Sequence, residues 1–251
     1  MDFQYGKHYR DLYQKHWWWR AREEALVGFL QRTLKTDPQR NILDVGCGDG
    51  LFFDKLAQFG NVEGVEPDAH LISADGPHVS KIRVIPFDKD FHSERKYGLL
   101  VMLDVLEHLE KPDEALECAH SLLTEDGALL LTVPAFKSLW TNHDVINHHK
   151  LRYRRGTLYP RLKKAGFKVM ESHYWYQWTV PAKFVLGVVQ KVRPSEPKLP
   201  NIPPTWLNKI LYGITRLEQQ TIGAMRIPLG STLMAYCTKA DRDAATRSWA
   251  Q

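Results

Sequence analysis

The sequence predicts an α/β fold in which helices cover both faces of a mostly parallel, doubly wound sheet of seven strands. Short apolar runs of strand length alternate with segments of helical periodicity through residues 41–178. The run at 97–105 is almost uniformly apolar, as expected of a strand that is buried on both faces. Glycines and charged residues follow the strand ends, where sheets of this kind bind their ligands.

The N-terminal segment, residues 1–36, is expected to be helical because its apolar residues recur at helical spacing. The core of the domain is expected over residues 37–176. Its predicted strands are 41–45, 61–66, 81–86, 97–105, 127–134 and 167–178. Its predicted helices are 49–60, 111–123 and 154–166, the last one kinked or restarted at Pro160.

Residues 177–229 interrupt this alternation and are expected to form a helical insertion before a final strand within 230–240. A helix at 180–192 places its apolar residues on one face and its polar residues on the other. The apolar face holds Phe184, Val185, Val188, Val189 and Val192, and the other face holds Lys183, Gly187, Gln190 and Lys191. Five prolines predict a stiff connector at 193–204, and Thr205 is the expected cap of a second amphipathic helix at 205–225.

Composition and charge limit the class of protein. The chain has 251 residues, of which 43% are apolar, as is ordinary for a globular protein with one sizeable α/β domain. Its three cysteines are far apart and odd in number, which indicates a reducing compartment and a cytoplasmic location. No signal peptide and no run of 18 apolar residues is found.

The charge is divided unevenly along the chain. Residues 1–149 carry 16 Lys and Arg against 24 Asp and Glu, a net charge of −8, whereas residues 150–251 carry 18 against 5, a net charge of +13. The C-terminal part is therefore expected to face an anionic partner, unless it is simply a solvated basic surface. Nucleic acid is not expected as that partner, because no nucleic-acid-binding motif is present.

The glycine-rich stretch after the first strand is the most informative motif. Residues 46–50 read Gly-Cys-Gly-Asp-Gly, and glycines at such a turn let the backbone approach a ligand closely. The spacing differs from the G-x-G-x-x-G pattern of nicotinamide-dependent oxidoreductases, which makes that class of enzyme a poor match. Sixteen residues after Gly50, the second strand ends in Glu66, whose carboxylate can accept hydrogen bonds from both hydroxyls of a ribose.

Four motifs together resemble the class I S-adenosyl-L-methionine-dependent methyltransferases, which have a Rossmann-like fold. LDVGCGDG at 43–50 matches their first motif, VEGVEPD at 62–68 is similar to their second, and LDVLEHL at 103–109 is similar to a fourth-strand motif. That last motif is found in a subgroup that includes the ubiquinone-pathway O-methyltransferases. HWWWRAR at 16–22 resembles the lid that precedes the fold in many members. The resemblance covers roughly residues 8–178 and implies a bacterial enzyme that acts on a small molecule.

The resemblance also implies which residues hold S-adenosyl-L-methionine. Glu66 is expected to bind the ribose diol, and Arg22 to pair with the cofactor carboxylate from an N-terminal helical lid, as arginine geometry favours. The alternative for Arg22 is a solvated side chain on a helix that packs against the sheet. The remaining expected contacts are Asp44, Gly46 and Gly48 for the methionine and ribose, Phe87 and Asp88 for the adenine, and Leu103 and Asp104 for the methyl sulfonium.

Three histidines follow the fifth strand, on the side of the sheet where an acceptor is expected. Methyl transfer is an in-line displacement that depends on positioning, and a hydroxyl or ammonium acceptor also needs a base, for which histidine is suited near neutral pH. His143 with Asp144, or His149 with Arg152 and Tyr153, could supply the base. These residues are similar to a block in a less characterised bacterial branch, from which the chain departs at Leu151.

Two alternatives remain at this stage. Asp104, Glu107 and His108, joined by a distant histidine, could bind a divalent ion that activates a hydroxyl, or Glu107 and His108 could only order a turn. We expect no metal. A non-catalytic protein that binds S-adenosyl-L-methionine is the main rival function.

The acceptor is expected to be a small molecule, lipid-linked or bearing a sugar or phosphate. The insertion at 177–229 then either covers the acceptor pocket as a lid, lies in a membrane interface, or simply packs on the domain. In the second case, the protein is expected to be peripheral at the inner face of the membrane. The sequence does not identify the methylated atom or the oligomeric state.

Overall fold

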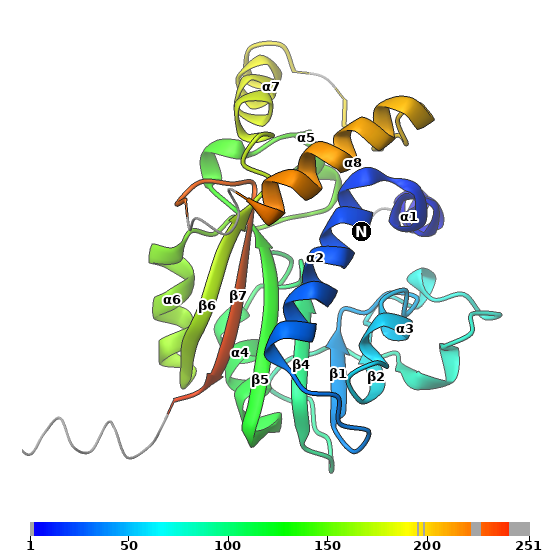
Figure 1. Ribbon diagram of the computed structural model, residues 1–251, viewed down its shortest axis with the longest axis vertical. Coiled ribbons are helices and arrows are strands. Elements are labelled where there is room, and N and C mark those ends of the chain that lie inside the picture. The colour runs from blue at the N-terminus through cyan, green and yellow to red at the C-terminus, as the bar shows by residue number, and fades with distance from the viewer. Residues whose placement is uncertain (1–2, 195, 198, 222–226, 241–251) are drawn as a thin grey trace, which may run out of the picture.

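A seven-stranded sheet forms the centre of the molecule (Figure 1). The computed structural model describes residues 3–194, 196–197, 199–221 and 227–240. The strand order is β3-β2-β1-β4-β5-β7-β6, and only β7 runs antiparallel to its neighbours. The predicted fold class, a Rossmann-like, doubly wound and mostly parallel sheet, is confirmed.

The strands are β1 (Asn41–Val45), β2 (Asn61–Val65), β3 (Ile82–Arg83), β4 (Tyr97–Leu103), β5 (Leu123–Pro134), β6 (Phe167–Trp175) and β7 (Thr232–Lys239). The α-helices are α1 (Phe3–Lys15), α2 (Trp17–Thr33), α3 (Phe53–Leu56), α4 (Pro112–Leu122), α5 (Asn142–Ile146), α6 (Arg155–Lys164), α7 (Val180–Val192) and α8 (Thr205–Gln220). Short 3₁₀-helices are η1 (Ala69–Leu71), η2 (Val79–Lys81) and η3 (Lys137–Leu139).

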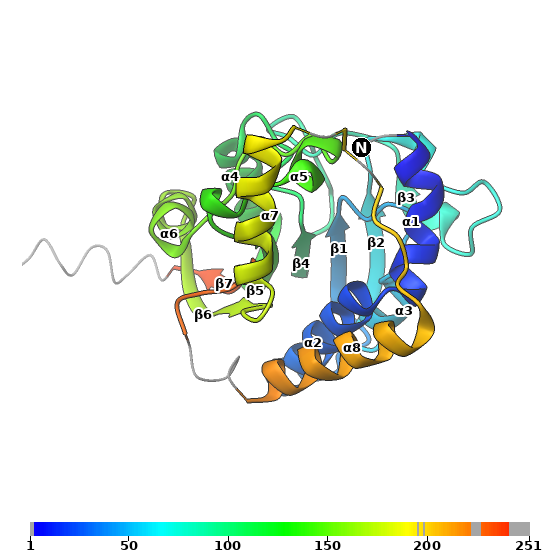
Figure 2. The same ribbon diagram turned by 90° about the horizontal axis from the view of Figure 1, so that it is seen from above.

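The apolar strands β1 and β4 are buried on both faces of the sheet. Leu43 and Leu100 point into a cluster that α4 and α6 close, whereas Ile42 and Leu99 point into a second cluster that α2 and α3 close. Figure 2 shows these helix pairs on opposite sides of the strands. Burying each such aliphatic side chain contributes about 1.5–3 kcal/mol, so these two layers fix the strand ends that carry the motifs.

Four predicted details of the core and insertion are wrong. The helix expected at 49–60 is reduced to Phe53–Leu56, because Gly50 has φ +69°, a conformation that no α-helix contains. The strand expected at 81–86 covers only Ile82–Arg83, because the N–H of Ile85 donates to Arg83 O at 3.1 Å in a local turn. Helix α6 runs through Pro160 without a break, and α8 is preceded by Pro204 as its N-cap, so that Thr205 is a helical residue.

The insertion contributes two helices at one end of the molecule. Helix α8 packs along α2, and α7 packs against η3 and the start of α5 (Figures 1 and 2). Residues 222–225, which the sequence assigns to the second of these helices, lie outside the described residues. None of the helices that the structure describes is long and apolar enough to cross a membrane.

Candidate active site

A cavity of about 610 Å³ lies at the carboxyl ends of the parallel strands. Its floor is formed by the residues that follow β1, β2, β4 and β5, and its walls come from α1, α2, the α5 region and α7. Seven of the predicted cofactor residues line it: Arg22, Gly46, Gly48, Glu66, Phe87, Leu103 and Asp104. Both predicted bases, His143 and His149, line it as well. One cavity therefore joins the two halves of the predicted site.

The glycine loop after β1 has backbone conformations that require glycine. Gly46, Gly48 and Gly50 all have positive φ values, between +53° and +69°. A Cβ on Gly46 would come within 2.7 Å of the side chain of Val105, whereas a Cβ on Gly48 would meet nothing within 4 Å. The open space beside Gly48 leaves room for a ligand to approach the backbone.

Glu66 directly follows β2 and faces this loop. Its two carboxylate oxygens accept hydrogen bonds from the backbone N–H of Gly48 and of Asp68, each at 3.0 Å. Burial raises the pKa of Glu66, and these two hydrogen bonds oppose that rise. Each oxygen keeps a second lone pair, so the carboxylate can accept further bonds from a diol in the cavity.

Arg22, from α2, is buried and forms an ion pair with Asp104 at the end of β4. Its guanidinium also lies over the ring of Trp18, 4.8 Å from the ring centroid. Asp104 has φ +55° and accepts a second bond from Thr132 Oγ1 at 3.0 Å. Arg22 was expected to pair with the carboxylate of the cofactor. In this structure it pairs with the carboxylate of Asp104 instead.

Two predicted cofactor residues do not line the cavity. Asp44 is buried beneath the glycine loop, and burial raises its pKa to about 8, although the nearby Arg22 opposes the rise. Asp88 lies beside the cavity-lining Phe87, but its Oδ1 accepts the N–H of Asp90 at 2.9 Å in a local turn. Of the two residues predicted to contact the adenine, Phe87 lines the cavity and Asp88 does not. The ring of Phe87 packs on Phe91.

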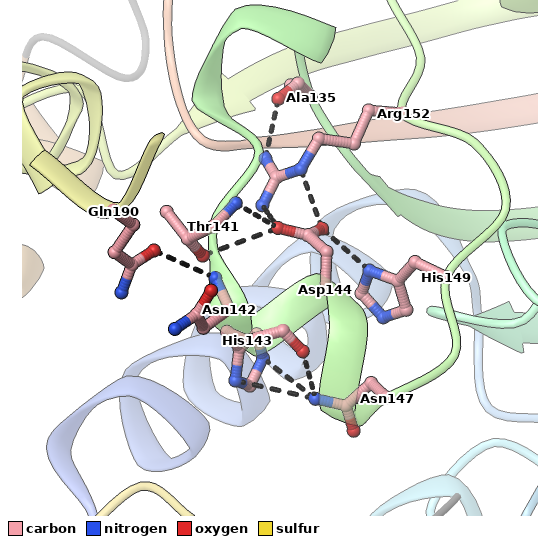
Figure 3. Close-up of polar contacts among 9 residues, drawn as sticks. All are labelled: Ala135, Thr141, Asn142, His143, Asp144, Asn147, His149, Arg152 and Gln190. Atoms are coloured by element: carbon pink, nitrogen blue, oxygen red, sulfur yellow. Dashed lines mark hydrogen bonds and ion pairs between the residues drawn. The ribbon is translucent and has the colours of Figure 1, made fainter. Parts of the chain in front are cut away.

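Asp144 is the centre of the polar network that follows β5 (Figure 3). Its fully buried carboxylate accepts bonds from Arg152 Nε at 2.7 Å, Arg152 Nη2 at 3.0 Å and Thr141 N at 2.9 Å. It also pairs with His149 Nδ1 at 2.8 Å. Burial alone would raise the pKa of Asp144, but the hydrogen bonds from His149 and Arg152 hold it well below its usual value.

In this network Asp144 pairs with His149, whereas the sequence had grouped it with His143. Beside an ionised Asp144, His149 Nδ1 carries the hydrogen and donates it, and Nε2 points away from Asp144 in Figure 3. His143 lies beside Asn147, and burial followed by the charge of Lys183 lowers the pKa of His143 to about 3. Tyr153 belongs to the core instead, where its hydroxyl donates to Leu106 O at 3.2 Å.

Glu107 and His108 form a second cluster with His149. One ligand atom from each of the three residues lies within 4.8 Å of the other two, so together they could hold a metal ion. Among the residues that the structure describes, neither carboxylate oxygen of Glu107 has a hydrogen-bond partner. Burial and the nearby Asp104 raise the pKa of Glu107 well above its usual value. Burial and the neighbouring His149 lower the pKa of His108 to about 4. Asp104, which the metal alternative included, pairs with Arg22 instead.

Lys183 is the contribution of the insertion to the cavity. It comes from the first turn of α7 and lines the wall near His143 and Arg152. Arg22 and Arg152 each have a carboxylate partner, but within the described part of the chain no carboxylate lies within 4.0 Å of Lys183 Nζ. Burial and the nearby Arg152 lower the pKa of Lys183 to about 8.

Sequence reasoning did not assign a role in the site to Lys183, Asp49 or the segment after β2. Asp49 Oδ1 accepts the N–H of Ser73 at 2.9 Å, and its other oxygen forms an ion pair with Arg10 of α1. These contacts tie the glycine loop to the cavity wall at 70–73 and to the N-terminal helix. The only sequence signal for Lys183 was its place on the polar face of an amphipathic helix.

Comparison with known proteins identifies the family. Residues 18–172 match the family model described as "Methyltransferase domain", which is more than half of the chain. The chain is 26% identical over 153 residues to the mitochondrial ubiquinone biosynthesis O-methyltransferase of Rattus norvegicus, across 57% of this chain and 41% of that protein. It is 30% identical over 105 residues to the ubiquinone biosynthesis O-methyltransferase of Glaesserella parasuis serovar 5, across 37% and 44%. The matched regions span less than half of either relative.

A solved structure has a similar fold. The Burkholderia thailandensis 1,6-didemethyltoxoflavin-N1-methyltransferase, with bound 1,6-didemethyltoxoflavin and S-adenosylhomocysteine, superposes with a TM-score of 0.57 at 16% identity. The superposition covers 92% of this chain and 82% of that one. The two chains thus share their overall fold.

Proposed function

The chain belongs to the methyltransferase-domain family, and on that premise we propose that it is an enzyme that transfers a methyl group from S-adenosyl-L-methionine to a small-molecule acceptor. The observation that supports this most directly is the open glycine loop with Glu66 beside it, in one cavity with the His149–Asp144 pair. The LDVGCGDG and LDVLEHL motifs support a place in the bacterial small-molecule branch. The three free cysteines fit a cytoplasmic enzyme.

The residues present fit the cofactor. The space beside Gly48 admits a ligand at the backbone, and Glu66 has lone pairs for the two ribose hydroxyls. Phe87 supplies an apolar wall for a base, and Trp18 and Arg22 close the site from α2. When bound, the cofactor supplies an electrophilic methyl group on a sulfonium, and the chain must supply the alignment and the base.

His149 is the proposed base. Asp144 holds its Nδ1–H, which leaves Nε2 free to take the proton of an acceptor hydroxyl or ammonium as the new bond forms. Arg152 and Thr141 hold Asp144 in turn, so the ring orientation does not depend on solvent. This second layer of contacts favours an enzyme over a protein that only binds the cofactor, because binding alone needs no oriented imidazole.

The acceptor is proposed to carry an anionic group, such as a phosphate or carboxylate. Lys183 faces the acceptor side of the cavity without a carboxylate partner in the described chain, next to the positive charge of Arg152. An anionic group bound there would form an ion pair with Lys183. A phosphate that is lipid-linked or attached to a sugar fits this position, because α7 of the insertion forms that wall of the cavity. The insertion thereby acts as a wall of the acceptor pocket.

A calorimetric titration with S-adenosylhomocysteine tests the cofactor site. We expect Glu66→Ala to weaken binding at least tenfold, because the loss of hydrogen bonds to a charged group costs about 1.5–3 kcal/mol. Glu63→Ala is the matched control, since Glu63 lies in β2, three residues before Glu66, and outside the cavity. Equal affinities of the wild type and Glu66→Ala would remove Glu66 from the site.

A further inference from the structure

Helix α7 turns its polar face toward the protein and its apolar face toward solvent. Gln190 Oε1 accepts the N–H of Asn142 at 2.9 Å, and Gly187 packs so closely that a Cβ there would lie 2.7 Å from Trp140 O. Lys183, on the same face, lines the cavity. The outward side chains are 46–74% exposed: Phe184, Val185, Leu186, Val188, Val189 and Val192.

Helix α8 has the same inverted orientation. Its buried residues are Asn208, Thr215 and Glu218, all of them polar. Asn208 accepts the N–H of Trp17 at 2.8 Å and donates to Lys15 O at 2.7 Å, while Glu218 accepts the N–H of Trp178 at 2.8 Å. The outward residues recur at helical spacing and are 44–65% exposed: Trp206, Ile210, Ile214 and Leu217.

An amphipathic helix of a globular protein normally packs its apolar face against the core. In α7 and α8 the hydrogen bonds of the polar faces fix the opposite orientation, so ten large apolar side chains are exposed on these helices. Both helices lie at one end of the molecule (Figure 1). Large exposed apolar side chains gathered on one helix face mark an interaction site more often than those scattered singly over a surface. We call these ten side chains the apolar surface of the insertion.

The charge around this surface points to its partner. Between residues 180 and 220 the sequence holds six Lys and Arg against two Glu. One of those two, Glu218, is buried against Trp178, whereas Lys191, Arg193 and Lys209 are exposed beside the apolar side chains. Apolar residues flanked by exposed cations are typical of helices that lie in the headgroup region of anionic bilayers.

We propose that α7 and α8 dock the protein on the surface of an anionic lipid bilayer through this apolar surface. The docking does not depend on the proposed methyl transfer. Because Lys183 and the apolar side chains occupy opposite faces of α7, the same helix would contact the bilayer and close the acceptor side of the cavity. An acceptor held in the bilayer would then reach the cavity along α7.

Vesicle flotation with the full chain tests this proposal. Wild-type protein should float with vesicles of phosphatidylcholine and phosphatidylglycerol at 7:3, and float less at high salt or with phosphatidylcholine alone. Val185→Gln/Val189→Gln should reduce the bound fraction by roughly tenfold, because it removes apolar contact from the centre of the α7 stripe. The control is Val79→Gln/Val84→Gln, which changes two side chains of 40% and 51% exposure outside the insertion and should float like the wild type.

Three outcomes would overturn the proposal. The wild type does not float with anionic vesicles, or Val185→Gln/Val189→Gln floats as well as the wild type while melting at the same temperature. The third is a dimer in light scattering that the same double variant converts to a monomer, which would assign the apolar surface to a second copy of the chain. Binding of S-adenosylhomocysteine, measured on the same samples, reports on the proposed activity separately.

Discussion

Replacing Asp144 by asparagine is the sharpest perturbation of the proposed acceptor site. The substitution keeps the size of the side chain but removes the negative charge that Arg152 and His149 share. Arg152, whose side chain is 2% exposed, would keep its bond to Ala135 O at 2.8 Å and could donate only to the one remaining side-chain oxygen at position 144. A buried guanidinium would then lack a compensating charge.

The expected cost follows from this burial. Breaking one partner of a buried ion pair costs about 3–5 kcal/mol, and the lower end applies here because the asparagine oxygen can still accept one bond. For a chain of this length, a loss of about 3 kcal/mol lowers the melting temperature by roughly 6–12 °C. The amide also leaves His149 without a fixed tautomer, so turnover should fall by about 10²–10⁴, the usual contribution of a general base.

Two assays separate these effects. Thermal unfolding followed by circular dichroism gives the stability change, and transfer of label from methyl-labelled S-adenosyl-L-methionine into an extract of source cells gives the turnover. Affinity for S-adenosylhomocysteine should be retained at a temperature where the variant is folded. The control is Glu110→Gln, which removes a carboxylate paired with Lys150 at 2.8 Å but 85% exposed, and should leave the melting temperature unchanged.

A melting temperature of Asp144→Asn within 2 °C of the wild type, together with full turnover, would refute the reasoning. It would mean that the buried network around Asp144 neither holds the loop together nor orients the base. A large stability loss with unchanged turnover would refute only the second part.

Three further predictions concern the same cavity. His149→Gln should lower the rate of label transfer by about 10²–10⁴, whereas His143→Gln should stay within about tenfold of the wild-type rate. Equal effects of the two substitutions would contradict the assignment of His149 as the base. Lys183→Met should reduce binding of inorganic phosphate, measured by calorimetry on the protein loaded with S-adenosylhomocysteine. Lys191→Met should not, because Lys191 is an exposed side chain of the same helix that does not line the cavity. Unchanged phosphate binding in Lys183→Met would oppose an anionic acceptor. Because Lys183 has a pKa lowered to about 8 and loses its charge as the pH rises, this binding should weaken above pH 8 and persist at pH 7. A chelator should leave label transfer unchanged, and lost transfer that Mg²⁺ or Zn²⁺ restores would assign a metal to Glu107, His108 and His149.

The cofactor side of the site could be read from the sequence because it depends on local backbone. The positive φ values of Gly46, Gly48 and Gly50 follow from a strand that must turn sharply into the next segment, and only glycine adopts them without strain. Glu66 follows from the register of parallel strands, which brings the ends of β1 and β2 to one edge. The uniformly apolar sequence of β4 likewise predicted a strand that is covered by helices on both faces of the sheet.

The acceptor side could not be read in the same way, because tertiary contacts decide it. Asp144 is one residue from His143 and five from His149 in the sequence. Because of the helical turn of α5 and the position of Arg152, the Asp144 carboxylate nevertheless pairs with His149. The amphipathic pattern of 180–192 identified two faces without saying which one faces the protein. In the structure, the polar face packs against the protein through the hydrogen bond from Asn142 to Gln190 and the close packing at Gly187. This orientation places Lys183 in the cavity.

The central claim is that the cavity at the carboxyl ends of the strands binds S-adenosyl-L-methionine for methyl transfer. Calorimetric titration of the wild-type chain with S-adenosylhomocysteine tests it most directly, since it needs no knowledge of the acceptor. The account predicts saturable binding at one site per chain with a dissociation constant of about 1 μM–1 mM, the range of working substrate affinities, and a clear loss of affinity in Glu66→Ala. No heat of binding at millimolar ligand, with the wild type shown to be folded, would contradict it.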